Sequence, residues 1–390
     1  MNLPDRIDNP GVEKNSSAEM LGECLREEMA RSDDFYLFSP DETGSNKLDA
    51  VFQETNRAWV RETLPWDRNL APDGRVVELL SENALFAVLT GHILSGGRGA
   101  MTSYEAFLTI VSSQLDQHLK FLKQSKEIDW RPDYNALNLL STSCWQRQDH
   151  NGYTHQSPAV ISSLLSRPSN LANCLFPVDD VAAVAAWEFM ASSKNVVNLA
   201  TFNKTKEPRW MDINHARFQL ENGGASVFGF ASDANPDMVF AGVGDIPTKE
   251  LLAARDIVKA EVPGVKIEFV GIAALSYGAI GTTENKMSQE LFDEYFTADK
   301  PILVNFHGYA ETLTGILARY AKVARLDVHG YEDEGSTTTP LDMLVRNRCD
   351  RYSLAMAAFE WLDRTDLVEK YEGVLAENYQ SARDFGVDIV

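Results

Sequence analysis

Cysteine is scarce in this chain: 390 residues contain four, and no two are close enough in sequence for a CxxC pair or a zinc-binding spacing. A disulfide-stapled miniprotein is therefore excluded. No run approaches the ~18 apolar residues of a membrane helix, and the first residues are polar and unlike a secretory signal. Scattered thiols without such a signal favour a reducing compartment, so we expect a cytoplasmic protein.

Positively charged residues are also few in this chain. Lys and Arg number 36 against 57 Asp and Glu, which gives a formal net charge of −21. A globally basic surface for nucleic acid is therefore missing, and an anionic substrate would have to be held by a few local cations. The content of 44% hydrophobic and 24% charged residues is ordinary for a globular protein. A length of 390 residues predicts two or three domains.

Apolar runs and their spacing predict an α/β protein. Residues 17–31 have the spacing of an amphipathic helix, and residues 103–123 are expected to form one long helix. Short apolar runs separated by enough residues for a helix favour parallel strands. In the first half of the chain these runs are 136–141, 171–177 and 195–202.

A polar stretch between residues 207 and 237 suggests a domain boundary near residue 212. Residues 1–16 are expected to be a flexible lead-in. Beyond the boundary a second α/β unit is predicted, with strands at 238–245, 265–272, 301–309 and 325–331 and a helix at 248–262.

The AGVGD segment after the strand at 238 invites a dinucleotide-binding interpretation, but the third glycine of GxGxxG would fall on Pro247. Gly242 and Gly244 are better explained by a tight turn, with Pro247 in the first turn of the following helix. The chain contains no GxxxxGK[ST], HExxH or GxSxG motif.

RQDHNGYTHQ, residues 147–156, is the densest polar segment and follows the apolar run 136–141. Ligands usually bind at the carboxyl ends of strands in α/β sheets. His150 and His155, with Asn151 between them, suit proton transfer or recognition of phosphate and hydroxyl groups near neutral pH. The residue types alone leave a hydrogen-bonded structural loop equally open.

Three further polar residues stand out. Glu82 lies in an otherwise apolar stretch, where a carboxylate costs free energy unless it is paired or used, although an exposed helix position remains the alternative. Ser45 lies at a polar turn beside Lys47, and Lys204 follows the apolar run 195–202.

At these residues the chain resembles phosphoketolases. The resemblance runs from about residue 10 to the C-terminus and is carried by SPDETGSNKL, LLSEN, SYEAF, RQDHNGYTHQ and DVHGYEDEGSTTTPLDM. It implies two three-layer α/β/α domains with mostly parallel sheets: a pyrimidine-binding domain at 17–212 and a C-terminal domain at 213–390. It also implies a thiamine-diphosphate enzyme, a carbon–carbon lyase that cleaves ketose phosphates with inorganic phosphate to acetyl phosphate and an aldose phosphate.

The resemblance implies roles for the polar residues. Glu82 matches the glutamate that hydrogen-bonds the cofactor's pyrimidine ring, an interaction that is strong in a dry site. Tyr104 and Phe107 match aromatic residues beside that ring. His150, Asn151 and His155 match polar residues around the reacting carbons, with His155 the first choice for proton transfer. The sugar phosphate would be held by Ser45, Lys47, His150 and Lys204.

The resemblance covers only the C-terminal half of such an enzyme. The other half holds the cofactor's diphosphate through Mg²⁺ and carries a GDG segment followed by an Asn pair, neither of which occurs here. We therefore expect a partner subunit with that half, hence a hetero-oligomer, and no metal site in this chain. Whether the chain is a natural subunit or a trimmed piece stays open.

Three departures from the family pattern are expected near the site. Asn83 stands where the family usually has His, Lys47 where many members have Arg, and residues 95–99 read SGGRG in place of TGRHG. They leave an alternative open, in which the same split assembly transfers a two-carbon ketol or acyl unit to another acceptor, as transketolases do. A non-catalytic subunit is the third hypothesis. Residues 335–340, GSTTTP, are expected to cap a helix and not to line an interface.

Overall fold

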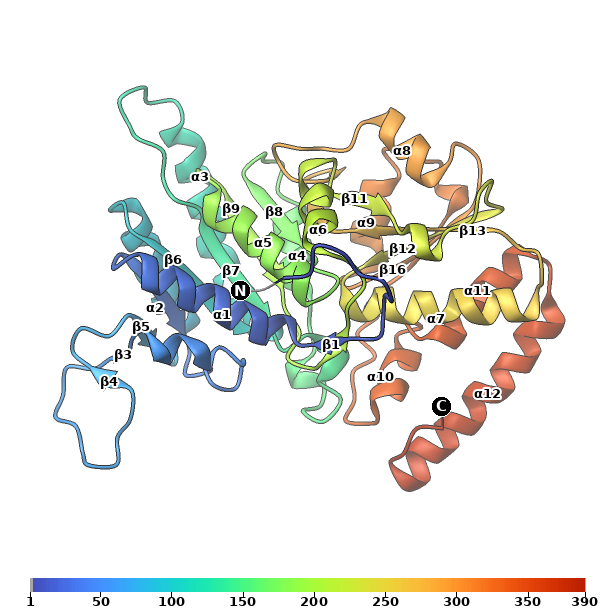
Figure 1. Cartoon of the computed structure of the whole chain (residues 1–390), viewed down its shortest axis with the longest axis horizontal. Coiled ribbons are helices and arrows are strands. Elements are labelled where there is room, and N and C mark those ends of the chain that lie inside the picture. Colours follow the sequence, from blue (N-terminus) through green and yellow to red (C-terminus); the bar gives the residue numbers. More distant parts are fainter. Residues whose placement is uncertain (1–2, 390) are drawn as a thin grey trace. The chain divides into compact units, whose positions relative to one another are not determined.

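The computed structural model describes residues 3–389 and divides into two compact units. Unit 1 comprises the chain up to residue 143 together with 169–217, and unit 2 comprises 144–168 together with the chain from residue 218. The architecture is α/β with mostly parallel sheets, as predicted (Figure 1). The division between residues 212 and 213 stays a prediction, and residues 1, 2 and 390 lie outside the described residues.

Unit 1 is built on a parallel sheet with the order β8-β9-β7-β6-β2-β5-β3-β4. Its central strands are mainly apolar and are buried along most of their length, which is typical of a parallel sheet covered on both faces. The strands predicted at 136–141, 171–177 and 195–202 are confirmed as β7, β8 and β9. The strands are β2 (Phe35–Ser39), β3 (Arg57–Ala58), β4 (Leu70–Ala71), β5 (Val76–Glu78), β6 (Arg98–Tyr104), β7 (Leu137–Thr142), β8 (Ala172–Leu175) and β9 (Val197–Thr201).

The helices of unit 1 confirm one prediction and correct another. α1 covers Ser17–Arg31 as predicted, and the Ser16 side chain caps it by accepting from the backbone N–H of Glu19. The single helix predicted at 103–123 is wrong, because β6 runs to Tyr104 and pairs with β7. The next seven residues form a 3₁₀ segment that ends in three β-branched residues, a type with lowered helix propensity. The remaining elements are η1 (Asp49–Gln53), α2 (Glu82–Leu94), η2 (Glu105–Val111), α3 (Ser112–Ser125) and α5 (Asp180–Ser192).

The segment that we expected to be a flexible lead-in contains β1 (Lys14–Asn15). This strand pairs antiparallel with β10 (Glu207–Pro208). The backbone N–H of Gly11 also donates to the carbonyl of Arg209. The described part of the lead-in is therefore hydrogen-bonded to unit 1.

Unit 2 holds a five-stranded sheet with the order β11-β13-β12-β16-β17. Only β11 is antiparallel to its neighbour. The four strands predicted beyond residue 237 are confirmed as β12, β13, β16 and β17. The strands are β11 (Ala225–Val227), β12 (Met238–Val243), β13 (Ile267–Ile272), β16 (Ile302–Phe306) and β17 (Leu326–His329), beside a hairpin of β14 (Ala274–Ser276) and β15 (Ala279–Ile280).

The turn between β12 and α7 (Asp245–Glu261) has the form predicted for its glycines. Gly244 has a φ of +104°, and a Cβ on Gly242 would lie 2.4 Å from Thr248 Oγ1. Gly244 therefore needs glycine for its positive φ, and Gly242 needs it for the close approach of Thr248. Pro247 lies in the first turn of the helix.

The other helices of the chain are short, apart from the last one, α12. They are η3 (Trp145–Arg147), η4 (Tyr153–His155), α4 (Ala159–Leu165), α6 (Ile213–Glu221), η5 (Gly229–Ala231), α8 (Gln289–Phe296), α9 (Ala310–Leu317), η6 (Val323–Arg325), α10 (Pro340–Arg346), α11 (Arg351–Trp361) and α12 (Thr365–Phe385). No helix within residues 3–389 has both the length and the apolar character needed to cross a membrane.

Candidate active site

The candidate residues of unit 1 follow the carboxyl ends of its parallel strands. Ser45 lies in the loop after β2, Glu82 follows β5, Tyr104 ends β6, and Lys204 follows β9. Because β9, β7, β6, β2 and β5 are adjacent and parallel, their carboxyl ends lie along one edge of the sheet. This edge is where ligands bind in open α/β sheets.

Glu82 is the first residue of α2, and it is half-buried. The Ser81 side chain caps the helix by accepting from the backbone N–H of Ala84 at 3.3 Å. A carboxylate in the first helical turn is stabilised by the helix dipole. Ser103 Oγ, at the end of β6, donates to Glu82 Oε1 at 3.4 Å. The Glu82 side chain is therefore turned toward the neighbouring strand end and is not a fully exposed helix position.

Tyr104 is the centre of a cluster that joins four of the predicted residues. Its hydroxyl donates to Ser45 Oγ at 3.1 Å. Its ring stacks on that of Phe107, with a centroid distance of 6.0 Å and an interplanar angle of 14°. Lys204 Nζ lies 4.5 Å from the centroid of the Tyr104 ring, which is the distance of a cation–π contact. An aromatic face, a hydroxyl and a cation thus meet at this edge.

Glu42 is a site residue that the sequence analysis missed. Its Oε2 accepts from the backbone N–H of Tyr104 at 3.2 Å. Burial raises the pKa of Glu42 to about 7, and the negative charge of Glu82 adds to the increase. The available signal was its place in SPDETGSNKL, three residues before Ser45. The edge therefore holds two carboxyl groups that interact electrostatically.

The loop after β2 is fastened to the sheet by buried polar contacts. The Thr142 hydroxyl, at the end of β7, lies 2.8 Å from Asn46 Oδ1 and 3.1 Å from the carbonyl oxygen of Ser103. Asn46 and Thr142 are fully buried. These contacts hold the loop that carries Glu42 and Ser45 against β6 and β7.

Lys47 belongs to the same loop but lines a different region, a cavity next to α1. It is exposed, and its φ of +64° places it in the left-handed region. It lines a cavity of about 530 Å³ together with Glu19 and Glu23 of α1. Its proposed role toward the sugar phosphate therefore has less geometric support than the roles of Ser45 and Lys204.

His150, Asn151 and His155 lie in unit 2, on the loop that contains η3 and η4. Asn151 Nδ2 donates to Gln148 Oε1 at 2.8 Å, and His155 Nδ1 lies 2.9 Å from Thr154 Oγ1. His150 and Asn151 are exposed, and His155 is half-buried. The loop therefore presents both imidazoles at the surface of unit 2.

This loop is anchored to the segment 331–339. The Tyr331 hydroxyl donates to the carbonyl of Gln156 at 2.8 Å, Gln156 Nε2 donates to the carbonyl of Ser336 at 3.1 Å, and the N–H of Thr338 donates to the carbonyl of Asp149 at 2.9 Å. Thr339 then caps α10 through the backbone N–H of Asp342. The GSTTTP segment thus has the capping role that was predicted, and it also supports the histidine loop.

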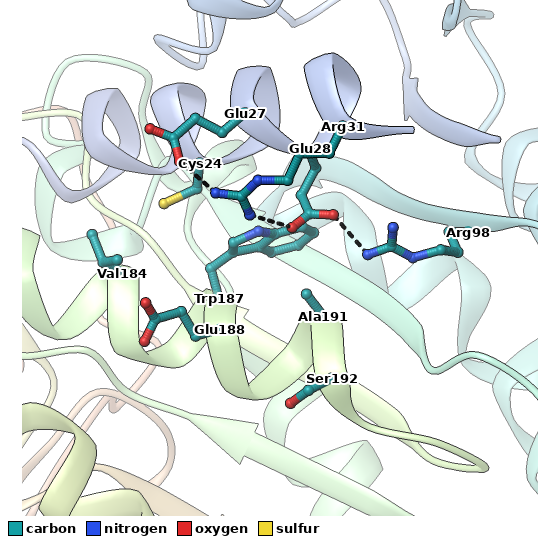
Figure 2. A pocket seen from close by; sticks show the side chains of 10 residues that line it. All are labelled: Cys24, Glu27, Glu28, Arg31, Arg98, Val184, Trp187, Glu188, Ala191 and Ser192. Atoms are coloured by element: carbon teal, nitrogen blue, oxygen red, sulfur yellow. Dashed lines mark hydrogen bonds and ion pairs between the residues drawn. The ribbon is translucent and has the colours of Figure 1, made fainter. Parts of the chain in front are cut away.

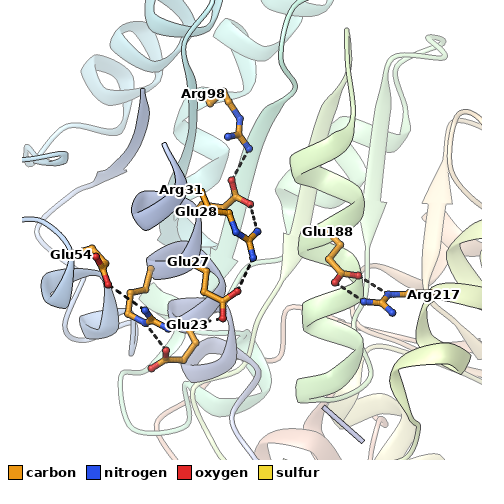
Figure 3. A network of polar contacts seen from close by, with 9 residues as sticks. Glu23, Glu27, Glu28, Arg31, Glu54, Arg98, Glu188 and Arg217 are labelled. Carbon is orange, nitrogen blue, oxygen red and sulfur yellow. Dashed lines mark hydrogen bonds and ion pairs between the residues drawn. The ribbon is translucent and has the colours of Figure 1, made fainter. Parts of the chain in front are cut away.

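The SGGRG departure is not near the cluster, contrary to the prediction. Arg98 begins β6 and Tyr104 ends it, and six residue steps along a strand span about 20 Å. Arg98 Nη2 instead pairs with Glu28 Oε2 of α1 at 2.6 Å. It lines a cavity of about 340 Å³ with residues of α1 and α5 (Figure 2). Glu28 also pairs with Arg31, so this departure belongs to a structural ion-pair network (Figure 3).

Comparison with known proteins decides the family. The family model for D-xylulose 5-phosphate/D-fructose 6-phosphate phosphoketolase matches residues 18–193, and the model of its C-terminal domain matches residues 204–389. The chain belongs to the phosphoketolase family. Phosphoketolases and their transketolase-like relatives depend on thiamine diphosphate, generally with a divalent metal.

The relatives are longer than this chain. A probable phosphoketolase of Rhodopseudomonas palustris (strain TIE-1) is 39% identical over 369 residues, which are 92% of this chain and 47% of the relative. One from Pediococcus pentosaceus is 36% identical over 407 residues, covering 100% of this chain and 52% of the relative. The chain thus spans about half the length of the curated relatives it matches.

Solved structures show the transketolase-like fold. A transketolase from Pichia stipitis, in complex with sedoheptulose 7-phosphate, gives a TM-score of 0.71 at 14% identity, covering 95% of this chain and 48% of that chain. A split-gene transketolase, described as an inactive β4 tetramer, gives a TM-score of 0.59 at 15% identity and covers 88% of this chain and 97% of that one.

Proposed function

We propose that this chain is the pyrimidine-side half of a thiamine-diphosphate-dependent phosphoketolase. The enzyme would cleave a ketose phosphate with inorganic phosphate to acetyl phosphate and an aldose phosphate. The observation that carries the proposal is the convergence of Glu82, Ser45, Tyr104 and Lys204 on one edge of a parallel sheet, in a chain of this family.

The residues at this edge fit the pyrimidine part of the cofactor. A half-buried carboxylate, Glu82, and a stacked aromatic pair, Tyr104 and Phe107, are the groups that can hydrogen-bond and orient a flat heteroaromatic ring. The bound cofactor supplies the carbanion chemistry that breaks the carbon–carbon bond. Glu82 would hydrogen-bond a ring nitrogen, and Tyr104 and Phe107 would contact the ring.

The remaining residues are assigned to the substrate. Ser45 and Lys204 would bind its phosphate, since a hydroxyl and an ammonium group lie against the same Tyr104 ring. His150 would add a further phosphate contact, and Asn151 would contact the hydroxyls next to the reacting carbons. His155 would move the proton that the loss of a substrate hydroxyl requires. Lys47 is retained as a weaker phosphate candidate.

We propose that a second chain supplies the site for the diphosphate and Mg²⁺. The curated relatives are about twice as long as this chain, and a split-gene transketolase of matching length has a similar fold. Among residues 3–389 no group of three or more His, Cys, Asp or Glu side chains could hold a metal ion. In the proposed assembly the metal would be held mainly by the partner subunit.

The transketolase-like transfer to another acceptor has lost its main support. It was motivated by the SGGRG departure, and Arg98 lies at the opposite end of β6 from Tyr104. We therefore retain phosphate as the proposed acceptor.

Reconstitution tests the proposed function. The purified chain is titrated with thiamine diphosphate and Mg²⁺ by calorimetry, and acetyl phosphate formation from xylulose 5-phosphate and phosphate is assayed with and without a chain carrying the diphosphate-binding domain. We expect weak cofactor binding and no turnover alone, and acetyl phosphate without any aldose acceptor in the assembly. Micromolar cofactor binding by the isolated chain would contradict the split site, and product that requires an acceptor sugar would contradict the reaction.

Glu82→Gln tests the catalytic assignment in the same assembly. Loss of the acid should lower turnover by about 100-fold or more and leave the unfolding temperature nearly unchanged. Glu62→Gln, which removes an acid from an exposed loop of the same unit, serves as the control and should retain full activity. Near wild-type turnover of Glu82→Gln would refute the assignment.

A further inference from the structure

We propose that the cavity between α2 and α3 binds a small, uncharged, ring-bearing molecule that can both donate and accept hydrogen bonds. The cavity measures about 400 Å³ and lies within unit 1. The proposal rests on the side chains that line this cavity and not on the proposed reaction.

Three of the residues that line this cavity carry buried polar atoms without a hydrogen-bond partner among the described residues. Thr90 Oγ1, Gln114 Oε1 and both ring nitrogens of His118 are buried and have no hydrogen-bond partner among the described residues. The His118 side chain is only 4% exposed. Buried polar atoms in folded proteins are almost always hydrogen-bonded, because an unmade bond costs the full desolvation of the group. Because four such atoms belong to side chains that line one cavity, we infer a binding site in which a ligand supplies the missing hydrogen-bond partners after small side-chain movements.

Apart from Gln117, the rest of the cavity wall is apolar and aromatic. Phe86 meets the His118 ring edge to face, with a centroid distance of 6.4 Å and an interplanar angle of 89°. Phe121 and Leu94 complete the wall. Aromatic side chains arranged in this way bind flat apolar rings.

Charge is absent from the lining. The described residues that line the cavity include no Lys, Arg, Asp or Glu, in a chain of which 24% is charged. Burial lowers the pKa of His118 to about 4, so the imidazole is neutral at pH 7. A charged ligand would lose its hydration without gaining a counter-charge. The site therefore selects an uncharged molecule.

The donors and acceptors of the lining side chains restrict the chemical class of the ligand further. Gln114 Nε2 donates to the carbonyl of Asn83 at 3.0 Å, which fixes the amide and leaves its oxygen as an acceptor. A neutral imidazole offers one donor and one acceptor, and the Thr90 hydroxyl offers both. A primary carboxamide on an aromatic ring matches this set, because it carries two N–H donors and one acceptor.

Benzamide is a suitable probe, with acetophenone as its matched control, because acetophenone has a methyl group in place of the amide NH₂. The full chain is titrated with each probe, and binding is followed by NMR through the shifts of α2 and α3 and the ¹⁵N resonances of the His118 ring. We expect saturable benzamide binding at this cavity and acetophenone binding about tenfold weaker or worse. Equal affinities, or no saturation by benzamide up to about 10 mM, would overturn the proposal.

Two variants test whether benzamide binds in this cavity. Thr90→Val keeps the side-chain shape and removes the hydroxyl, and His118→Phe keeps a ring and removes both nitrogens. Each should weaken benzamide binding severalfold and acetophenone binding less, because acetophenone can only accept hydrogen bonds. Ser113→Ala, at an exposed α3 residue outside the cavity, should change neither. If ordered water alone satisfies these atoms, the variants will lower the unfolding temperature and benzamide will not bind, which would refute the proposal. The two-probe comparison on the wild-type chain decides the question even if a variant does not fold.

Discussion

Replacing Glu42 with Gln should make the stability of unit 1 less dependent on pH. Burial raises the pKa of Glu42 from 4.5 to about 7. A group whose pKa is higher in the folded state than in the unfolded state stabilises the fold fully below its unfolded pKa, and that contribution is lost as the pH rises through the folded pKa. The wild-type protein should therefore lose stability between about pH 4.5 and pH 7 through this group, and the variant should not.

The size of the effect follows from the two pKa values. The difference between 4.5 and about 7 corresponds to a ceiling of about 3.4 kcal/mol at 1.36 kcal/mol per pKa unit. Glu42 is only half-buried, so solvent screening reduces the ceiling. We expect Glu42→Gln to stabilise the protein by about 1–2 kcal/mol at pH 8 and by almost nothing at pH 4.5. The Gln side-chain oxygen can still accept from the N–H of Tyr104.

Urea unfolding followed by tryptophan fluorescence measures this difference. At pH 8 the midpoint of Glu42→Gln should exceed that of the wild type by about 0.5–1 M, and at pH 4.5 the two midpoints should coincide. Glu62→Gln controls for the loss of one negative charge and should give no such pH-dependent difference. A Glu42→Gln midpoint that is shifted equally at both pH values, or is lower at pH 8, would refute the reasoning.

Three further outcomes are expected. The charge of Glu82 helps to raise the pKa of Glu42, so in Glu82→Gln the free energy of unfolding should finish its pH-dependent decrease at lower pH than in the wild type. An unchanged pH profile of the unfolding free energy would contradict this coupling. Thr339→Ala should destabilise the protein by about 1 kcal/mol through loss of the α10 cap, which thermal unfolding can measure. Burial raises the pKa of Cys24 to about 12, so a thiol reagent at pH 8 should label it only after denaturation, and rapid labelling of the native chain at this residue would refute its burial.

The strands β7, β8 and β9 were predictable from the sequence because each is a short, mainly apolar run, a pattern that is typical of a parallel sheet covered on both faces. The structure of segment 103–123 was not predictable in this way, because its apolar residues recur at helical spacing although Ser103 and Tyr104 belong to β6. Pairing of β6 with β7 outweighs the periodicity there. Tertiary contacts that the sequence does not reveal decide such cases.

Residues that owe their role to burial were the hardest to predict. Glu42 lies in a turn segment that also contains Asp41, and nothing in the sequence distinguishes the acid that the fold buries from the one that it exposes. Glu82 was easier because it interrupts an apolar run. Ser45 and Lys204 stood out by their positions in polar segments, Tyr104 was found through the family motif SYEAF, and the three residues lie together in the structure.

The placement of the three departures bears on substrate choice. Arg98 and Tyr104 lie at opposite ends of β6, about 20 Å apart. Arg98 of the SGGRG segment therefore takes part in the ion pairs of α1 and would not contact a sugar bound near Tyr104. Lys47 lines a cavity together with the acids Glu19 and Glu23 of α1. Asn83 is the departure adjacent to Glu82, and its backbone carbonyl accepts from Gln114. Any difference in substrate choice from other phosphoketolases should therefore arise first from position 83, where a change of side chain lies next to the acid that we assign to the cofactor.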